Sequence, residues 1–192
     1  MMKVVAFNGS ARKGGNTKLL LEAALKPLQD NGAATELVEL SGANPKGCRA
    51  CGVCIKKKDR TCVIKDDIIN ECVEKMAAAD AIILGSPTYF ADVTTEMKAL
   101  IDRCGMVGRA NGNLYKRKIG AAVAVARRAG EIHAFDTMNH FFQIGHMFIV
   151  GSSYWNVGFG REKGEVSNDS EGIQTMTDLG ENIDWLLQKI HA

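Results

Sequence analysis

Five short apolar runs recur along the chain, and a segment with helical periodicity follows each of them. The runs cover residues 3–7, 34–40, 81–87, 118–127 and 147–153. The helical segments cover residues 18–32, 66–80, about 94–104, 130–145 and 171–190. Because parallel strands need crossover connections and are buried on both faces, this alternation predicts an α/β fold, a doubly wound five-stranded parallel sheet covered by helices. Asp66 or Asp67 is expected to cap the second helical segment.

The chain is long enough to bury a core and close to the usual size of one domain, at 192 residues with 46% hydrophobic and 24% charged. No repeat or linker divides it, so we expect one domain over residues 1–192 with a Cys-rich insertion at about 44–65. The net charge of +2 is too small to predict a nucleic-acid partner. No apolar stretch approaches the roughly 18 residues that cross a bilayer, and no signal peptide is recognisable. We therefore expect a cytoplasmic protein that does not bind membranes.

The loop after the first run, NGSARKGGNT (8–17), predicts a phosphate site. In such a sheet ligands bind outside the carboxyl ends of the strands. This loop opens a helix, whose N-terminus attracts anions, and its glycines let backbone amides approach a ligand. The polar and small residues concerned are Ser10, Arg12, Gly15, Asn16 and Thr17. Because the loop matches neither the nucleotide triphosphate motif nor the dinucleotide motif, a phosphomonoester fits best. The alternative is an ordinary Gly-rich turn capped by Thr17.

A second loop, GSPTYFADVTTEMK (85–98), follows a fully apolar run. Its Pro87 predicts a rigid turn, and Thr88, Tyr89 and Phe90 place a hydroxyl and two aromatic rings at the same edge of the sheet as the phosphate loop. Aromatic side chains pack against planar heterocycles while polar groups meet their edges. The two loops together predict a pocket for a ligand with an anionic tail and a flat head.

Three motifs in this order resemble the flavodoxin-like family of NAD(P)H-dependent FMN reductases, and specifically its iron–sulfur flavoprotein branch. They are FNGSARKGGNT (7–17), GSPTYFADVTTEMKALIDR (85–103) and GSSYWNVGFG (151–160), and the resemblance extends over essentially the whole chain. It implies a flavodoxin-like three-layer sandwich, FMN as cofactor and NAD(P)H as a candidate co-substrate. It also implies a homodimer or a tetramer of dimers.

The resemblance carries roles onto residues of this sequence. The phosphate loop named above would bind the FMN phosphate, and the residues at 87–90 would line the isoalloxazine and ribityl chain. A third loop would close the far side of the ring with Arg127, Arg128 and Gly130. It departs from the Gly-Gly-x-x-Gly pattern common in the reductases, and its arginines suggest a guanidinium that balances reduced flavin. The alternative is that these arginines contact solvent or a neighbouring subunit. No catalytic residue is assigned.

Four cysteines stand close together in KGCRACGVCIKKKDRTC (46–62): Cys48, Cys51, Cys54 and Cys62. Iron–sulfur flavoproteins resemble this chain in having such a segment, and Cys-x2-Cys-x2-Cys lets one loop supply three thiolates to a 4Fe–4S cluster. Zinc is a competing metal, although structural zinc usually takes two separated Cys-x2-Cys pairs. The third alternative is no metal. Cys72 and Cys104 lie outside the cluster and are expected to be small buried side chains.

The resulting hypothesis is an FMN-dependent oxidoreductase that transfers electrons between a reduced donor, such as NAD(P)H or ferredoxin, and an acceptor. One alternative is a cluster-free NAD(P)H-dependent reductase of FMN, quinones or nitro compounds. Another is a non-catalytic FMN electron carrier or redox sensor. Tyr154, Trp155 and Phe159 would favour an enzyme if they shaped a substrate pocket, but aromatic residues are also enriched in dimer interfaces.

Overall fold

The structure is a computed structural model that describes residues 1–191. Its strands are β1 (Lys3–Asn8), β2 (Ala34–Glu39), β3 (Ala81–Pro87), β4 (Ile119–Ala126), β5 (Phe148–Ile149) and β6 (Val157–Phe159). Its helices are α1 (Asn16–Asp30), α2 (Val53–Lys57), α3 (Ile69–Ala78), α4 (Thr95–Ala110), α5 (Glu131–Ile144), the 3-10 helix η1 (Glu165–Asn168) and α6 (Ser170–Ile190). Apart from α2, β6 and η1, each lies where the hydrophobic pattern predicts an element.

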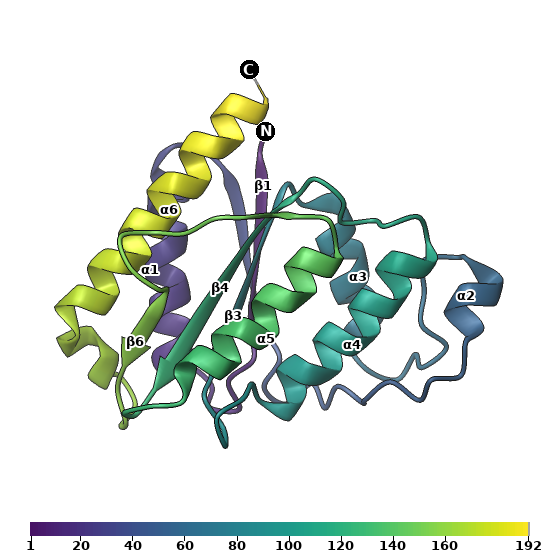
Figure 1. The fold of residues 1–192 in the computed structure, drawn as a ribbon, viewed down its shortest axis with the longest axis horizontal. Helices are drawn as coiled ribbons and strands as arrows, with labels where there is room; N and C mark the ends of the chain where they lie inside the picture. The colour runs from purple at the N-terminus through teal and green to yellow at the C-terminus, as the bar shows by residue number, and fades with distance from the viewer. Residues whose placement is uncertain (192) are drawn as a thin grey trace.

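The strands form one parallel sheet in the order β2-β1-β3-β4-β5, with β6 also paired to β4. Alternate residues of β1 belong to different cores: Val5 and Phe7 face α3, α4 and α5, whereas Val4 and Ala6 face α1 and α6. Figure 1 shows these two helical layers on either side of the sheet. The predicted α/β fold with a doubly wound parallel sheet is confirmed.

The last edge of the sheet differs from the prediction of one strand over 147–153. β5 pairs only with Ile119 and Gly120 at the start of β4, and β6 pairs with its end. Between them the chain leaves the sheet, and buried Asn156 fills the gap. The Asn156 side-chain amide donates to the carbonyl of Ala122 at 3.0 Å, and the Asn156 backbone carbonyl accepts from the amide of Ala124 at 2.9 Å. Asn156 therefore bonds to β4 in the gap through both its side chain and its backbone.

Two helix boundaries also differ. α4 continues to Ala110, past the expected end near residue 104, and its Gly105 and Gly108 lie against other side chains. A Cβ at Gly108 would lie 2.5 Å from the Tyr115 ring. α3 begins at Ile69, and Asp67 accepts the Ile69 amide at 3.2 Å rather than forming the helix cap. Among residues 1–191, no helix is both long and apolar enough to cross a bilayer.

Candidate functional site

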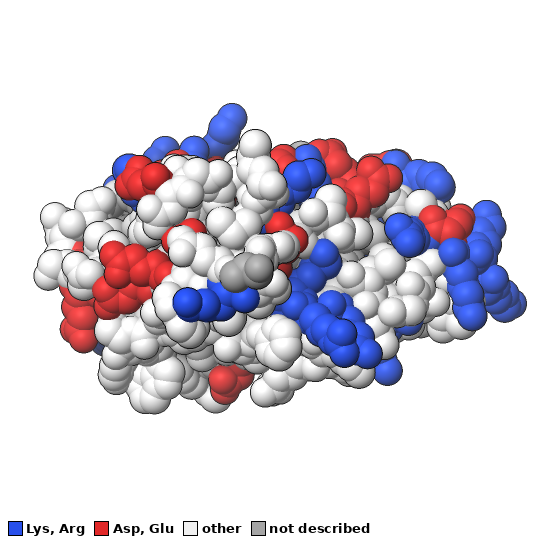
Figure 2. All heavy atoms as spheres, turned by 90° about the horizontal axis from the view of Figure 1, so that it is seen from above, with Lys and Arg blue, Asp and Glu red and all other residues white. Residues whose placement is uncertain are grey.

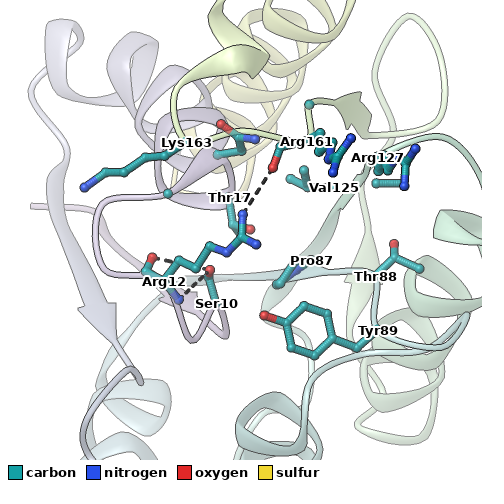
Figure 3. A pocket seen from close by; sticks show the side chains of 14 residues that line it. Ser10, Arg12, Thr17, Pro87, Thr88, Tyr89, Val125, Arg127, Arg161 and Lys163 are labelled. Carbon is teal, nitrogen blue, oxygen red and sulfur yellow. Dashed lines mark hydrogen bonds between the residues drawn. The ribbon is translucent and has the colours of Figure 1, made fainter.

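The segments that follow β1, β3, β4 and β6 meet around one cavity of about 280 Å³ (Figure 3). They meet because carboxyl ends of parallel strands share one edge of the sheet. The wall is formed by Ser10, Arg12, Gly15, Asn16, Thr17, Pro87, Thr88, Tyr89, Val125, Ala126, Arg127, Gly160, Arg161 and Lys163. All residues predicted for the phosphate loop are among them.

The loop after β1 is ordered by hydrogen bonds from its own polar side chains. Buried Asn8 accepts the amide of Ser10 at 3.0 Å and donates to Glu39 at 2.8 Å. The Ser10 hydroxyl then accepts the amide of Arg12 at 3.1 Å. Thr17 is buried in the first turn of α1, whose N-terminal amides lack intrahelical partners. The loop thus presents donors and a helix N-terminus to the cavity, which suits a phosphate group.

Thr94 fastens this loop to the segment after β3. Its hydroxyl donates to the carbonyl of Gly9 at 2.6 Å and accepts the amide of Met97 at 3.2 Å, so it also caps α4. The two chains approach so closely that a Cβ at Gly9 would lie 2.8 Å from the Cβ of Met97. Sequence reasoning did not identify Thr94, although a threonine before a helix is a recognised cap signal.

The segment after β3 is a tight turn in which Tyr89 and Asp92 exchange backbone hydrogen bonds of 2.8 and 3.0 Å. Pro87, Thr88 and Tyr89 lie in the cavity wall. Phe90 lies at the tip of the turn, fully exposed at φ +49°, and does not line the cavity. The buried hydroxyl oxygen of Thr88 has no hydrogen-bond partner within residues 1–191. A buried polar atom on a cavity wall without a partner fits a ligand with a polar edge.

The predicted third loop contributes only partly. Arg127 lines the cavity, whereas Arg128 is exposed and lies outside its wall. Gly130 also lies outside, but its position at φ +90° brings it against Ala91, where a Cβ would be 3.3 Å from the Ala91 Cα and Cβ. Gly130 therefore allows the loops after β3 and β4 to pack together.

Sequence reasoning missed the segment after β6, because it ended the last strand at residue 153. Gly160, Arg161 and Lys163 all line the cavity. A cluster of glycines and cations after a strand, GREKG (160–164), is the signal that could have identified it. With Arg12 and Arg127 the wall carries a cationic surface, and none of its residues is acidic, so it attracts anions. Tyr154, Trp155 and Phe159 are not in the wall.

A second, separate cavity of about 130 Å³ is lined by all four cysteines of the segment between β2 and α3. Cys48 and Cys51 are exposed, Cys54 and Cys62 are half-buried, and all four are free thiols. Burial raises the pKa of the Cys54 thiol. Within residues 1–191 no three His, Cys, Asp or Glu side chains lie close enough to bind one metal ion. Four cysteine thiolates are a ligand set that both tetrahedral zinc and a 4Fe–4S cluster use.

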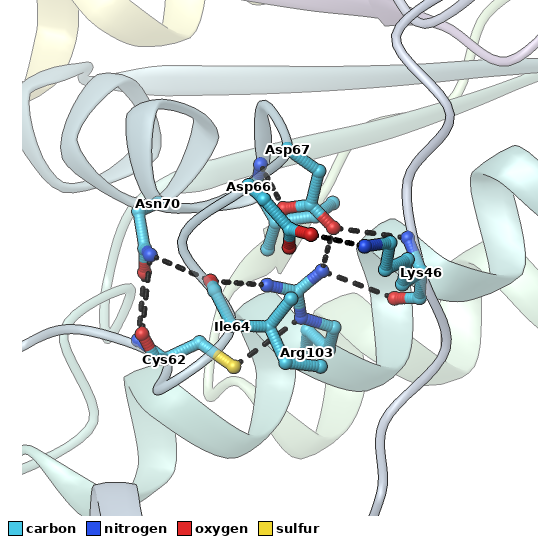
Figure 4. A network of polar contacts seen from close by, with 8 residues as sticks. Lys46, Cys62, Ile64, Asp66, Asp67, Asn70 and Arg103 are labelled. Carbon is cyan, nitrogen blue, oxygen red and sulfur yellow. Dashed lines mark hydrogen bonds and ion pairs between the residues drawn. The ribbon is translucent and has the colours of Figure 1, made fainter.

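Buried Arg103 of α4 holds the last of these cysteines in place (Figure 4). Its Nε donates to the Sγ of Cys62 at 3.3 Å, and its other nitrogens donate to the carbonyls of Lys46 and Ile64, each at 3.0 Å. Asp67 neutralises the guanidinium in an ion pair with both side chains fully buried. Sequence reasoning gave Arg103 no role, and its place within an amphipathic helix offers no local signal.

Asn70 completes this network from α3. Its side-chain oxygen accepts the amide of Cys62 at 2.6 Å, and its nitrogen donates to the carbonyls of Cys62 and Ile64 at 3.1 and 3.0 Å. The backbone around Cys62 is therefore held by two helices, α3 and α4. The Sγ of Cys62 faces a cationic donor, which stabilises negative charge on sulfur.

Comparison with solved structures supports the fold. A flavodoxin from the domain Archaea superposes with a TM-score of 0.64 at 18% identity, covering 97% of this chain and 99% of that one. An NADH:FMN oxidoreductase, EMOB, in its apo form gives a TM-score of 0.65 at 18% identity, covering 98% of this chain and 90% of that one. The predicted flavodoxin-like architecture is thus confirmed.

Sequence comparison identifies the family. Iron-sulfur flavoprotein MJ1083 of Methanocaldococcus jannaschii is 36% identical over 189 residues, 95% of each chain. An iron-sulfur flavoprotein of Methanosarcina thermophila is 34% identical over 191 residues, 98% of this chain and 97% of that one. The sequence profile described as NADPH-dependent FMN reductase matches residues 2–162. This chain belongs to the NADPH-dependent FMN reductase family, whose members are flavin-dependent oxidoreductases.

Proposed function

We propose that this protein is an iron–sulfur flavoprotein that transfers electrons between a reduced donor, NAD(P)H or ferredoxin, and an acceptor through FMN and a 4Fe–4S cluster. The observation that carries the proposal is that Cys48, Cys51, Cys54 and Cys62 all line one cavity. Because Cys48 and Cys51 are exposed, a role as small buried side chains does not explain why these thiols gather around a common space. The names of the similar archaeal proteins support the same reading.

The larger cavity suits FMN, which supplies hydride and single-electron chemistry when bound. Ser10, Thr17 and Arg12 would hold its phosphate, because they present hydroxyls and a guanidinium at the N-terminus of α1. Thr88 would meet the polar edge of the ring with its unpartnered hydroxyl. Tyr89 would pack against the ring. Arg127 would place positive charge beside reduced flavin.

The smaller cavity suits a cluster, which supplies single-electron transfer when bound. The four cysteines would be its ligands. Arg103 would orient Cys62 and donate a hydrogen bond to its sulfur. Hydrogen bonds to ligand sulfurs raise the stability of the more negative, reduced state, so Arg103 would tune the potential.

The surface around the cysteines supports an acidic electron-transfer partner such as ferredoxin. Figure 2 shows Lys and Arg side chains gathered at the end of the molecule where Figure 1 places α2. The exposed cations between residues 49 and 60 are Arg49, Lys56, Lys57, Lys58 and Arg60. If this patch binds ferredoxin, Lys56→Glu/Lys57→Glu should slow reduction by ferredoxin and weaken its salt dependence. Lys26→Glu, on α1, should leave the rate of reduction by ferredoxin unchanged. Equal slowing of that rate in both variants would refute this docking site.

We also propose that the protein assembles as a homodimer, alone or within a tetramer of dimers. Tyr154 and Trp155 are each 55% exposed and pack together with ring centroids 4.7 Å apart. Such exposed aromatics are typical of interfaces. Light scattering of the intact protein should give at least twice the monomer mass, and Trp155→Lys should lower it. A monomeric wild-type protein would refute the assembly.

The cofactors are tested by purification without oxygen, followed by a visible spectrum and iron and sulfide analysis. We expect flavin bands, plus a broad absorbance that dithionite bleaches, with four irons and four sulfides per chain. Alanine at each of the four cysteines should remove iron and leave FMN bound, whereas Cys72→Ala should retain both. FMN without iron in the wild-type protein would favour the cluster-free NAD(P)H-dependent reductase. A protein that binds no FMN after reconstitution would refute both.

The electron donor is tested by stopped-flow reduction of the loaded protein with NADH, NADPH or reduced ferredoxin. Reduction by at least one of them on the timescale of turnover is expected. If none reduces the protein, the reductase assignment fails. Reduction without transfer to any quinone, nitro compound or protein acceptor would favour a non-catalytic carrier or redox sensor.

A further inference from the structure

The segment 160–165, here called the strap, follows β6 and ends at the first residue of η1. It reaches the cavity from a part of the sequence far from the phosphate loop. We propose that the strap is a second part of the phosphate site, in which Arg161 and Lys163 bind the FMN phosphate and Asn16 is the positioning residue that holds them there. This inference rests on the proposed binding of FMN in the larger cavity.

The strap is fastened to the phosphate loop by side chains of that loop. The Asn16 side-chain nitrogen donates to the carbonyl of Glu162 at 2.9 Å, and its oxygen accepts the amide of Gly164 at 2.8 Å. Arg12 donates to the carbonyl of Arg161 at 3.1 Å, as Figure 3 shows. Both the oxygen and the nitrogen of the Asn16 side-chain amide therefore bond to the strap. The Asn16 side chain can affect a ligand only by positioning the strap, whereas the Asn16 backbone amide remains available to a ligand.

The strap is also ordered internally. The carboxylate of Glu165 accepts the amides of Arg161 and Glu162 at 2.6 and 2.7 Å. Gly160 begins the strap by donating its amide to the carbonyl of Ala126 at 2.9 Å. A Cβ at Gly160 would lie 2.7 Å from the Asn16 nitrogen and 2.8 Å from the Val166 amide. The strap is therefore a preformed element, and binding a ligand does not have to order it.

The cations of the strap lie over the phosphate loop. The Lys163 ammonium is 3.5 Å from where a Cβ would stand at Gly14, and Arg161 and Lys163 share the cavity wall with Ser10 and Thr17. Arg161 Nε is 3.2 Å from a Glu162 carboxylate oxygen, which balances part of its charge. Lys163 forms no salt bridge with any residue from 1 to 191. Lys163 is therefore expected to contribute more to anion binding than Arg161.

Comparison of FMN with riboflavin isolates the phosphate, because the two ligands differ only in that group. Dissociation constants are measured by flavin fluorescence quenching on the full chain after removal of flavin. Lys163→Ala should raise the dissociation constant of FMN about tenfold, since a hydrogen bond to a charged group is lost. The dissociation constant of riboflavin should stay unchanged. Lys163→Arg should restore most of the FMN affinity. Lys13→Ala is the matched control, because Lys13 carries the same charge on the neighbouring phosphate loop but lies outside the cavity wall.

Asn16→Ala should also weaken the binding of FMN several-fold relative to the binding of riboflavin. In addition, hydrogen exchange at the Gly164 amide should become faster in the flavin-free protein, because that amide loses its acceptor. A change in exchange without a change in ligand selectivity would mean that the strap is only structural.

The proposal is overturned if wild-type protein prefers FMN to riboflavin and neither Lys163→Ala nor Asn16→Ala alters that preference by more than twofold. If the wild-type protein binds neither flavin, the proposed function fails instead, and the two failures are distinguished by the wild-type measurement alone.

Discussion

The Nε of Arg103 donates a hydrogen bond to the Sγ of Cys62 at 3.3 Å, and the same guanidinium is ion-paired with Asp67 where neither side chain is exposed. One of the four cysteines in the segment between β2 and α3 therefore depends on a buried charge pair between α4 and the residues just before α3. Removing either charge leaves the other charge buried without its partner. This lowers the free energy of unfolding far more than the loss of a surface ion pair does.

Asp67→Asn is expected to lower the free energy of unfolding at pH 7 by about 3–5 kcal/mol, because Arg103 stays charged and buried. Burial works to raise the pKa of Asp67, but hydrogen bonds from Arg103 and from the amides of Lys46 and Ile69 outweigh it and hold the pKa below its ordinary value. The stabilisation is therefore present above about pH 4 and is lost as the pH falls through the folded-state pKa.

The difference between wild type and Asp67→Asn should accordingly be constant near neutral pH and shrink in acid, measured by urea unfolding of flavin-free protein at several pH values. Asp66→Asn is the matched control, because Asp66 pairs with Lys46 at the surface and should change stability far less. A difference that stays the same down to pH 2 would contradict the assigned role of the ion pair.

Thiol reactivity should divide the cysteines into two groups in metal-free protein. Desolvation raises the pKa of Cys72 to about 12 and that of Cys104 well above its ordinary value, and only the thiolate is alkylated. Brief treatment with iodoacetamide at pH 8 should modify Cys48 and Cys51 first and leave Cys72 and Cys104 unmodified, as read by peptide mass spectrometry. Rapid modification of Cys104 would show that the core around it opens more readily than its burial implies.

The sheet and its ligand-binding edge could be predicted because they follow from local patterns. Apolar runs define the strands, and parallel pairing places their carboxyl ends together, so the loops after β1 and β3 meet in the structure as the sequence indicates. The split of the last strand could not be predicted, because it depends on Asn156 bonding a strand 34 residues earlier. The attachment of the strap to the phosphate loop escaped prediction for the same reason, because Asn16 bonds to Glu162 across 146 residues.

Gly180 is expected to be intolerant of a side chain. It lies where α6 crosses α1, and a Cβ there would be 2.2 Å from the carbonyl oxygen of Ala24 and 3.0 Å from Pro27. Gly180→Ala should force the helices apart and lower the free energy of unfolding by about 1–3 kcal/mol. Gly105→Ala serves as control, because its Cβ would meet the Phe141 ring at 3.6 Å, and it should be neutral or stabilising by up to about 1 kcal/mol. Equal effects in urea unfolding would contradict the close helix crossing.

Thr94→Val is expected to weaken both the fold and flavin binding. The change removes the hydroxyl that caps the Met97 amide and leaves the buried Gly9 carbonyl without its donor. The free energy of unfolding, measured with urea, should fall by about 2–3 kcal/mol. Because Thr94 also fastens the phosphate loop to the segment after β3, FMN affinity should fall in the same variant. Thr94→Ser should keep both properties, and Thr95→Val, at an exposed hydroxyl one residue later, should change neither. A Thr94→Val protein that loses stability but binds FMN normally would show that the two loops are held in place by other contacts.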